Sequence, residues 1–263
     1  MKYYMIPDLS RKDESLSLAR RYGLGFEYND FFDPDLLDDP VKLRERIDTC
    51  LSLGRTGDTL HGPFFDISLD SRDPGIRKLS FDRCRQAMEI GRELQVKGVV
   101  FHTNYVVWMT RDPSYCDRWV ERSAKAYLTL AGMFPELRIY IENMFDDSPG
   151  LLGKLIRTCQ SETGGDRIQA CLDVAHASLS STPLDLWFDE LSPLIGHLHL
   201  NDNDQSADLH QTIGQGKIDF AKVFGRMKEL PDKTSALIEI SDLAKTEQSV
   251  LYIKKGGYYG FTQ

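Results

Sequence analysis

The segment GHLHLNDND, residues 196–204, is the most informative about architecture because it joins a buried strand to a sudden run of polar side chains. Leu198 and Leu200 supply apolar surface, while His197 and His199 lie two residues apart and therefore project from the same face of a strand. Such a strand needs two different environments, one apolar and one that accepts imidazoles.

Similar strands recur along the chain. Short β-rich runs are expected in eight places, each followed by an amphipathic helical stretch. The runs are 2–7, 24–28, 58–62, 97–102, 138–143, 169–174, 195–201 and 236–241. Eight β/α units in 263 residues predict a single (β/α)8 TIM barrel that forms one domain over residues 1–263. A doubly wound open sheet is the alternative, but no Gly-x-Gly-x-x-Gly motif opens its first helix.

Residues that favour helix ends occur at several of the expected helix boundaries. Gly23 and Gly54 stand where helices are expected to end, and Ser80 and Asp219 where helices are expected to begin. The helix after the third strand is accordingly expected over residues 81–94.

The composition is that of an ordinary globular protein. A net charge of −8 with scattered basic residues argues against a nucleic-acid platform without excluding one. No apolar run is long enough to cross a bilayer, and Pro7 and Asp8 interrupt the N-terminal segment before a signal-peptide core develops. Five cysteines without a Cys-x-x-Cys pair suit reduced thiols. We therefore expect a cytoplasmic protein without membrane contact, and the oligomeric state stays open.

Ionisable side chains gather at the carboxyl ends of six consecutive expected strands. They are His61, His102, Glu142, Asp173, His199 and Glu239. Active sites of TIM barrels form at that end, so we expect these side chains to converge in the mouth. Converging carboxylates repel one another unless a cation neutralises them, and no Lys or Arg occurs at these strand ends. A divalent metal is therefore expected, and the mixed carboxylate and imidazole set suits Mn, Zn, Co or Mg.

Other residues near these strand ends are further candidates for the mouth. Those with metal-ligating groups are His176, Asp208 and His210. Phe64, Phe65 and Trp108 follow the third and fourth strands and are candidate pocket walls. Glu27 is either a substrate contact or a buried ion-pair partner. The turn at residues 214–216 either approaches a ligand with its backbone or is an ordinary tight turn.

In these segments the chain resembles the xylose isomerase-like TIM barrels, which include sugar isomerases and epimerases and the endonuclease IV-type nucleases. The resemblance is strongest in HGPFFDIS, VVFHTN, YIENM, CLDVAHASL, HLHLNDND, DLHQTIGQGKIDF and LIEIS. In the sugar-converting members a Glu, an Asp, a His and a second Glu hold one divalent metal. The resemblance implies that the corresponding ligands here are Glu142, Asp173, His199 and Glu239. The nuclease members hold three zinc ions, and their additional positions correspond to His61, His102, His176, Asp208 and His210.

Neighbouring residues favour the sugar-converting branch. The nuclease pattern has a Tyr and an Asn after the third-strand His, where this chain has Phe64, Phe65 and Asp66. It has Asp-Thr-Cys-His and Asp-Arg-His where this chain has DVAH, residues 173–176, and DLH, residues 208–210. The loop that leads from the seventh strand to Asp208 is also short for a nuclease.

The leading hypothesis is a divalent-metal-dependent isomerase or epimerase that acts on a small sugar, polyol or sugar derivative. Glu142 and Glu239 would move a proton next to a carbonyl that the metal polarises, and the additional His and Asp side chains would form a hydrogen-bonding rim. One alternative is a trinuclear-zinc phosphodiesterase that cleaves abasic DNA. The other is a non-catalytic sugar-binding barrel.

Overall fold

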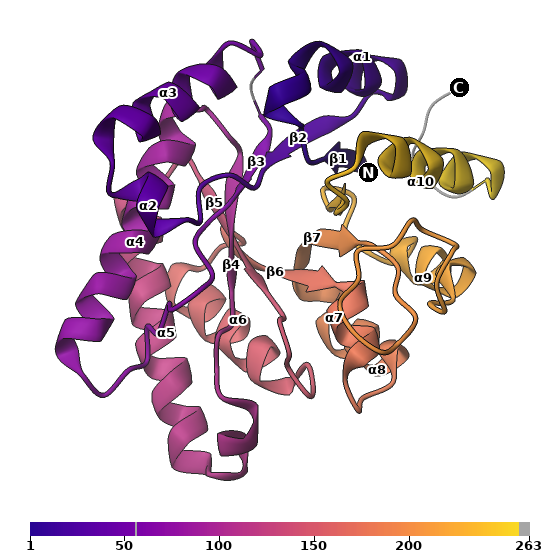
Figure 1. Ribbon diagram of the computed structural model, residues 1–263. Coiled ribbons are helices and arrows are strands. Elements are labelled where there is room, and N and C mark those ends of the chain that lie inside the picture. The colour runs from indigo at the N-terminus through magenta and orange to yellow at the C-terminus, as the bar shows by residue number, and fades with distance from the viewer. Residues whose placement is uncertain (56, 258–263) are drawn as a thin grey trace.

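The computed structural model describes residues 1–55 and 57–257, and its eight strands form a closed parallel barrel surrounded by helices (Figure 1). The strands are β1 (Lys2–Met5), β2 (Gly25–Tyr28), β3 (Thr59–His61), β4 (Gly98–His102), β5 (Arg138–Glu142), β6 (Ile168–Asp173), β7 (Ile195–Leu200) and β8 (Ser235–Ile238). Consecutive strands pair in parallel, and β1 pairs with β8 to close the ring. The expected single (β/α)8 TIM barrel is confirmed, and the open sheet is wrong.

The helices follow the strands, and α10 comes after the last one. They are α1 (Lys12–Tyr22), α2 (Pro34–Leu37), α3 (Pro40–Leu51), α4 (Pro74–Glu93), α5 (Pro113–Met133), α6 (Gly150–Thr163), α7 (Val174–Leu179), α8 (Leu184–Leu191), α9 (Phe220–Met227) and α10 (Leu243–Lys255). Within residues 1–55 and 57–257, three short 3-10 helices accompany them: η1 (Leu9–Arg11), η2 (Val107–Arg111) and η3 (Ser192–Leu194). Among the residues described, no helix is both long and apolar enough to cross a membrane.

Many helix boundaries follow from capping chemistry. Helices α2, α3, α4 and α5 each begin with an Asp-Pro pair, in which the carboxylate accepts from backbone N–H groups of the first turn. Asp219 caps α9 in the same way, as expected. Gly23 ends α1 in the left-handed conformation, with φ of 68°, and Gly54 follows α3 with φ of 61°. Both glycines therefore occupy backbone conformations that other residues rarely adopt.

The expected start of α4 at Ser80 is wrong. Asp73 caps this helix by accepting from the N–H groups of Gly75 and Ile76, so the helix already begins at Pro74. Ser80 is buried inside the helix, where its hydroxyl accepts from the backbone N–H of Ser68 at 2.9 Å. A serine hydroxyl can therefore accept from a backbone N–H of a neighbouring loop as readily as from one at the start of a helix.

The two faces of the strands lie in different environments, one facing the surrounding helices and the other facing the barrel interior. Leu198 and Leu200 belong to the main apolar core, which also includes residues of the surrounding helices. A separate small cluster of Val100, Tyr140 and Cys171 fills part of the barrel interior. His197 packs against Tyr140 with ring centroids 5.3 Å apart, so its face of β7 looks into the barrel. The alternation in residues 196–204 thus reflects these two environments.

Strand β8 ends at Ile238, earlier than the expected 236–241 run, so Glu239 is the first residue beyond it. Its backbone N–H donates to the carbonyl of Leu200 at 3.0 Å. Pairing with β7 therefore continues past the strand and places Glu239 beside the mouth.

The polar run after β7 anchors the long loop that leads to α9. The carboxylate of Asp202 accepts from the N–H groups of Gly214 and Gly216, at 2.9 Å each, and of Ile218, at 3.2 Å. A Cβ on Gly216 would lie 2.2 Å from Asp202 Oδ1, so this position requires glycine. Of the two expectations for the turn at 214–216, its contacts support the structural one, because its backbone binds a side chain of the protein itself.

Replacing Asp202 with Ala should lower the free energy of unfolding by about 2 kcal/mol, because it leaves several backbone N–H groups without their acceptor. Denaturant unfolding measures the change. Asp204→Ala is the matched control, since the Asp204 carboxylate accepts locally from Ser206. Equal losses in the two variants would contradict the anchoring role of Asp202.

Candidate metal centre

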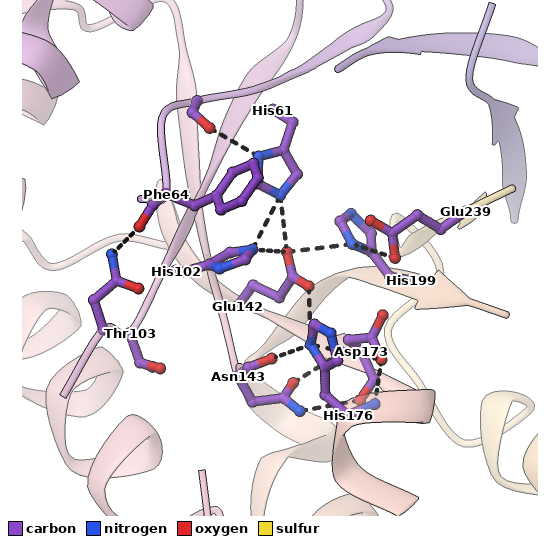
Figure 2. Close-up of polar contacts among 12 residues, drawn as sticks. His61, Phe64, His102, Thr103, Glu142, Asn143, Asp173, His176, His199 and Glu239 are labelled. Carbon is purple, nitrogen blue, oxygen red and sulfur yellow. Dashed lines mark hydrogen bonds and ion pairs between the residues drawn. The ribbon is translucent and has the colours of Figure 1, made fainter. Parts of the chain in front are cut away.

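Side chains from six strands or strand ends meet at the carboxyl end of the barrel, as Figure 2 shows. They are His61, His102, Glu142, Asp173, His199 and Glu239, and each is at most 7% exposed. Strand register explains their proximity, because His102 lies beside Glu142 and Asp173 lies beside His199 in neighbouring strands. The structure thus brings together the residues that the sequence distributes over about 180 positions.

His199 stands at the centre of this cluster. Its Nδ1 lies 3.2 Å from Glu142 Oε2 and 3.4 Å from Glu239 Oε2. Asn201 joins the remaining carboxylate, since its Nδ2 lies 3.4 Å from Asp173 Oδ2 and 3.3 Å from Glu239 Oε2. His199 Nδ1 and Glu142 Oε1 are buried without a hydrogen-bond partner. Unpartnered nitrogen and oxygen donors in a buried site fit a divalent cation.

The electrostatics of the cluster also favour a cation. Burial raises the pKa of Asp173 to about 8, and the charges of Glu239 and Glu142 act in the same direction. Burial also opposes ionisation of Glu239, but His199 holds its pKa at about 2. Although burial disfavours a charged imidazole, Cys171 and nearby carboxylates hold the pKa of His199 well above its ordinary value. Protons on Asp173 and His199 thus neutralise the cluster, and a divalent ion would replace them.

A second group of donors adjoins Glu142. The Nε2 atoms of His61 and His102 lie 3.2 Å apart, and each is 3.3 Å from Glu142 Oε2. His61 Nδ1 lies 2.9 Å from the carbonyl oxygen of Gly62, which accepts its proton. Although burial disfavours a charged imidazole, Glu142 raises the pKa of His61. His61 Nε2 therefore either carries a second proton, which it donates to Glu142, or offers its lone pair to a cation.

A third group lies at the edge of the mouth. His176 Nε2 and His210 Nε2 lie 3.2 and 3.0 Å from the same oxygen of Asp208. Their Nδ1 atoms face the backbone carbonyls of Asn143 and Glu239, at 2.9 and 2.8 Å. Each carbonyl holds a proton on Nδ1, so each Nε2 either carries a second proton or offers its lone pair to a cation.

The residues expected to wall the pocket fall into different environments. Phe64 packs on His102 and His61, with ring centroids 5.1 and 5.4 Å apart. Phe65 packs against Phe64, with ring centroids 4.3 Å apart, and is 60% exposed. Trp108 on η2 is 76% exposed, so both aromatic side chains are largely open to solvent. Glu27 is fully buried beside His197 and His199, which makes it an ion-pair partner below the mouth rather than a substrate contact.

Two asparagines that hold candidate ligands in place are not among the residues that the sequence predicts for the site. Asn143 accepts from the backbone N–H of Asp173 at 2.8 Å and donates to its carbonyl at 3.0 Å, which ties the ends of β5 and β6 together. Asn201 holds the carboxylates of Asp173 and Glu239 as described above. Both asparagines directly follow strand ends in YIENM and HLHLNDND, and that position is the signal that could have identified them.

The chain belongs to the xylose isomerase-like TIM barrel family, whose model matches residues 16–256. Two uncharacterized proteins of Methanocaldococcus jannaschii are similar at 26% and 29% identity, over 65% and 62% of this chain. The matches span only 60% and 62% of those relatives. The fructoselysine 3-epimerase of Escherichia coli O157:H7 is 21% identical over 77% of this chain and 72% of its own length.

Solved structures of several kinds share the fold. A Thermus thermophilus protein from crystals soaked with zinc chloride is 26% identical, with a TM-score of 0.76 and full coverage of both chains. A D-tagatose 3-epimerase-like protein is 21% identical, with a TM-score of 0.77 and 97% coverage of both chains. Endonuclease IV of Thermus thermophilus is 19% identical, with a TM-score of 0.64, covering 97% of this chain and all of its own. The last two likenesses concern the fold alone.

Glu142→Gln and Glu239→Gln should each weaken metal binding strongly. The loss should exceed the roughly 10- to 100-fold that is typical when a residue that hydrogen-bonds to a metal ligand is replaced. Each change removes a negative charge and leaves the volume of the side chain almost unchanged. Competition with a chelator measures the affinity for Zn, Mn, Co and Mg. Glu121→Gln, at an exposed position, is the control. Unchanged affinity in both site variants would contradict the centre.

Proposed function

We propose that the protein is a divalent-metal-dependent isomerase or epimerase of a sugar or sugar derivative. The observation that carries this proposal is the placement of Glu142 and Glu239, whose carboxylates both approach His199 Nδ1, at 3.2 and 3.4 Å. Two carboxylates at one centre provide a pair of groups that can remove and return a proton.

The proposed chemistry divides the work between a cofactor and the chain. A divalent ion held by Glu142, Asp173, His199 and Glu239 would supply the positive charge that makes a C–H bond beside a carbonyl more acidic. One glutamate then accepts the proton from carbon. The same glutamate can deliver that proton to the neighbouring carbon, or the other glutamate, if it is protonated beforehand, can deliver its own proton to the opposite face. Glu142 lies at the end of β5 and Glu239 just beyond β8, so the two carboxylates extend from different strands.

The surroundings of the centre favour an uncharged polyol over a phosphate ester. The charges that act most strongly on Glu142, Asp173 and Glu239 come from imidazoles and other carboxylates. None of these charges is a Lys or Arg that would bind a dianionic phosphate, whereas hydroxyl groups can hydrogen-bond to the imidazoles and carboxylates. In this proposal His176, Asp208 and His210 form the rim that orients those hydroxyls.

Proton transfer predicts that the metal-loaded protein exchanges a substrate C–H hydrogen with solvent. We expect deuterium incorporation from D2O into at least one member of a panel of ketoses, inosose-like polyols and their phosphates, detected by proton NMR. Chelator treatment and Glu239→Gln should each abolish the exchange, whereas Glu121→Gln should preserve it. Metal-loaded protein that leaves the whole panel unexchanged and unconverted would count against the proposal.

A second candidate function is a trinuclear-zinc phosphodiesterase, and a specific observation favours it. The donors of His61 and His102 at Glu142, and those of His176 and His210 at Asp208, form two additional groups around the central one. One ion cannot use all of these donors. Several zinc ions could activate water and stabilise a leaving oxygen.

Metal counting and a nuclease assay separate the two candidates. The isomerase proposal predicts about one tightly held zinc per chain and an uncut abasic-site duplex. Anomalous diffraction from zinc-soaked crystals counts the ions, and a labelled duplex reports cleavage. Three zinc peaks together with strand cleavage that His102→Ala abolishes would replace the isomerase with the phosphodiesterase.

A further inference from the structure

A chain of buried polar groups runs from the metal centre down through the barrel interior. Lys97 Nζ donates to Ser235 Oγ at 2.8 Å, and this hydroxyl lies 2.8 Å from His197 Nδ1. His197 Nε2 lies 3.1 Å from Glu27 Oε2, and Glu27 Oε1 lies 3.0 Å from His199 Nε2. Four of these five side chains are at most 1% exposed, and they are Glu27, His197, His199 and Ser235.

The direction of each contact follows from which groups can donate. The ammonium of Lys97 can only donate, so Ser235 Oγ accepts from it and turns its own hydrogen toward His197 Nδ1. A carboxylate can only accept, so His197 carries a proton on Nε2 and donates it to Glu27 Oε2. Thr59 Oγ1 donates to the same oxygen at 2.7 Å. The other oxygen of Glu27 can likewise only accept, which calls for a proton on His199 Nε2.

We propose that Glu27 is a positioning residue of the metal centre, whose carboxylate holds the proton of His199 on Nε2 and thereby presents Nδ1 to the metal. The nitrogen of a histidine that binds a metal is set by the hydrogen bond of the other nitrogen. His199 Nδ1 is the nitrogen that faces Glu142 and Glu239. This inference rests on the proposed metal centre and is independent of the reaction.

The burial of Glu27 supports a role beyond packing. A fully buried carboxylate is costly unless its oxygens are matched by donors. Oε2 has two donors, Thr59 and His197, whereas Oε1 has no aligned hydrogen bond and lies 3.0 Å from His199 Nε2, which also lacks one. The one unmatched oxygen of Glu27 therefore faces the one nitrogen of His199 that points away from Glu142.

A metal ion bound directly among Glu27, His197 and His199 is the competing explanation of these contacts. Both nitrogens of His197 already have hydrogen-bond partners, Ser235 and Glu27. An ion bound to His197 Nε2 would replace the proton that this nitrogen donates to Glu27 Oε2, whereas positioning of His199 leaves that hydrogen bond intact. The geometry therefore favours positioning.

The test uses Glu27→Gln and, as a matched control, Asp58→Asn. Asp58 is also a buried carboxylate, 1% exposed, but it accepts from the backbone N–H of Phe26 and from Arg55. Both variants should unfold at lower temperature than the wild type. Only Glu27→Gln should weaken zinc binding, by about 10- to 100-fold in chelator competition.

Nitrogen-15 NMR of labelled imidazoles gives a second readout that needs no variant. In the zinc-loaded wild type we expect a protonated Nε2 and a zinc-bound Nδ1 at His199, with no zinc-induced shift of the metal-binding type at His197. Zinc on His199 Nε2 or on His197, or equal zinc affinity of Glu27→Gln and Asp58→Asn, would overturn the inference. A wild type that binds no zinc, Mn, Co or Mg would instead remove the metal centre itself.

Discussion

The mutual repulsion of carboxylates held out of water is the constraint on which the mouth of this barrel depends. Glu142 and Glu239 converge on His199, and Asn201 links Asp173 to Glu239. None of the three carboxylates is more than 7% exposed. In this environment their charges must be neutralised locally, either by protons and imidazolium groups or by a metal. Burial chiefly raises the pKa of Asp173 to about 8, and nearby charges hold the pKa of His199 above its ordinary value, so both groups retain protons that reduce this repulsion.

The backbone around the mouth is organised to hold these side chains. Asn143 ties β5 to β6, and Asn201 spans Asp173 and Glu239. Asp202, next in the chain, accepts from backbone N–H groups of the turn at residues 214–216 and fixes the loop that carries Asp208 and His210. In the polar run that follows β7, Asn201 therefore holds the carboxylates of the mouth, and Asp202 holds the loop. Neither use requires these residues to touch a substrate.

The interior below the mouth extends this organisation. Glu27 connects His199 to His197, and Ser235 connects His197 to Lys97. Burying such a chain of donors and acceptors is costly unless its hydrogen bonds are made. Rotation of an imidazole would break these hydrogen bonds, so the chain also restricts the orientation of the rings. A rigid imidazole suits a centre whose ligands come from different strands, because barrel geometry alone does not choose between the two ring nitrogens.

Local sequence patterns were enough to predict the closed barrel and the chemical types of the mouth residues. Both follow from periodicity, since alternation in a strand sorts side chains onto two faces and the carboxyl ends of parallel strands share one edge. Only the folded arrangement shows that Glu27 lies beneath the mouth and that Glu239 follows its strand. It also sets which nitrogen of each imidazole faces a carbonyl and which faces the centre. These outcomes depend on the register between segments far apart in the chain, which local pattern does not encode.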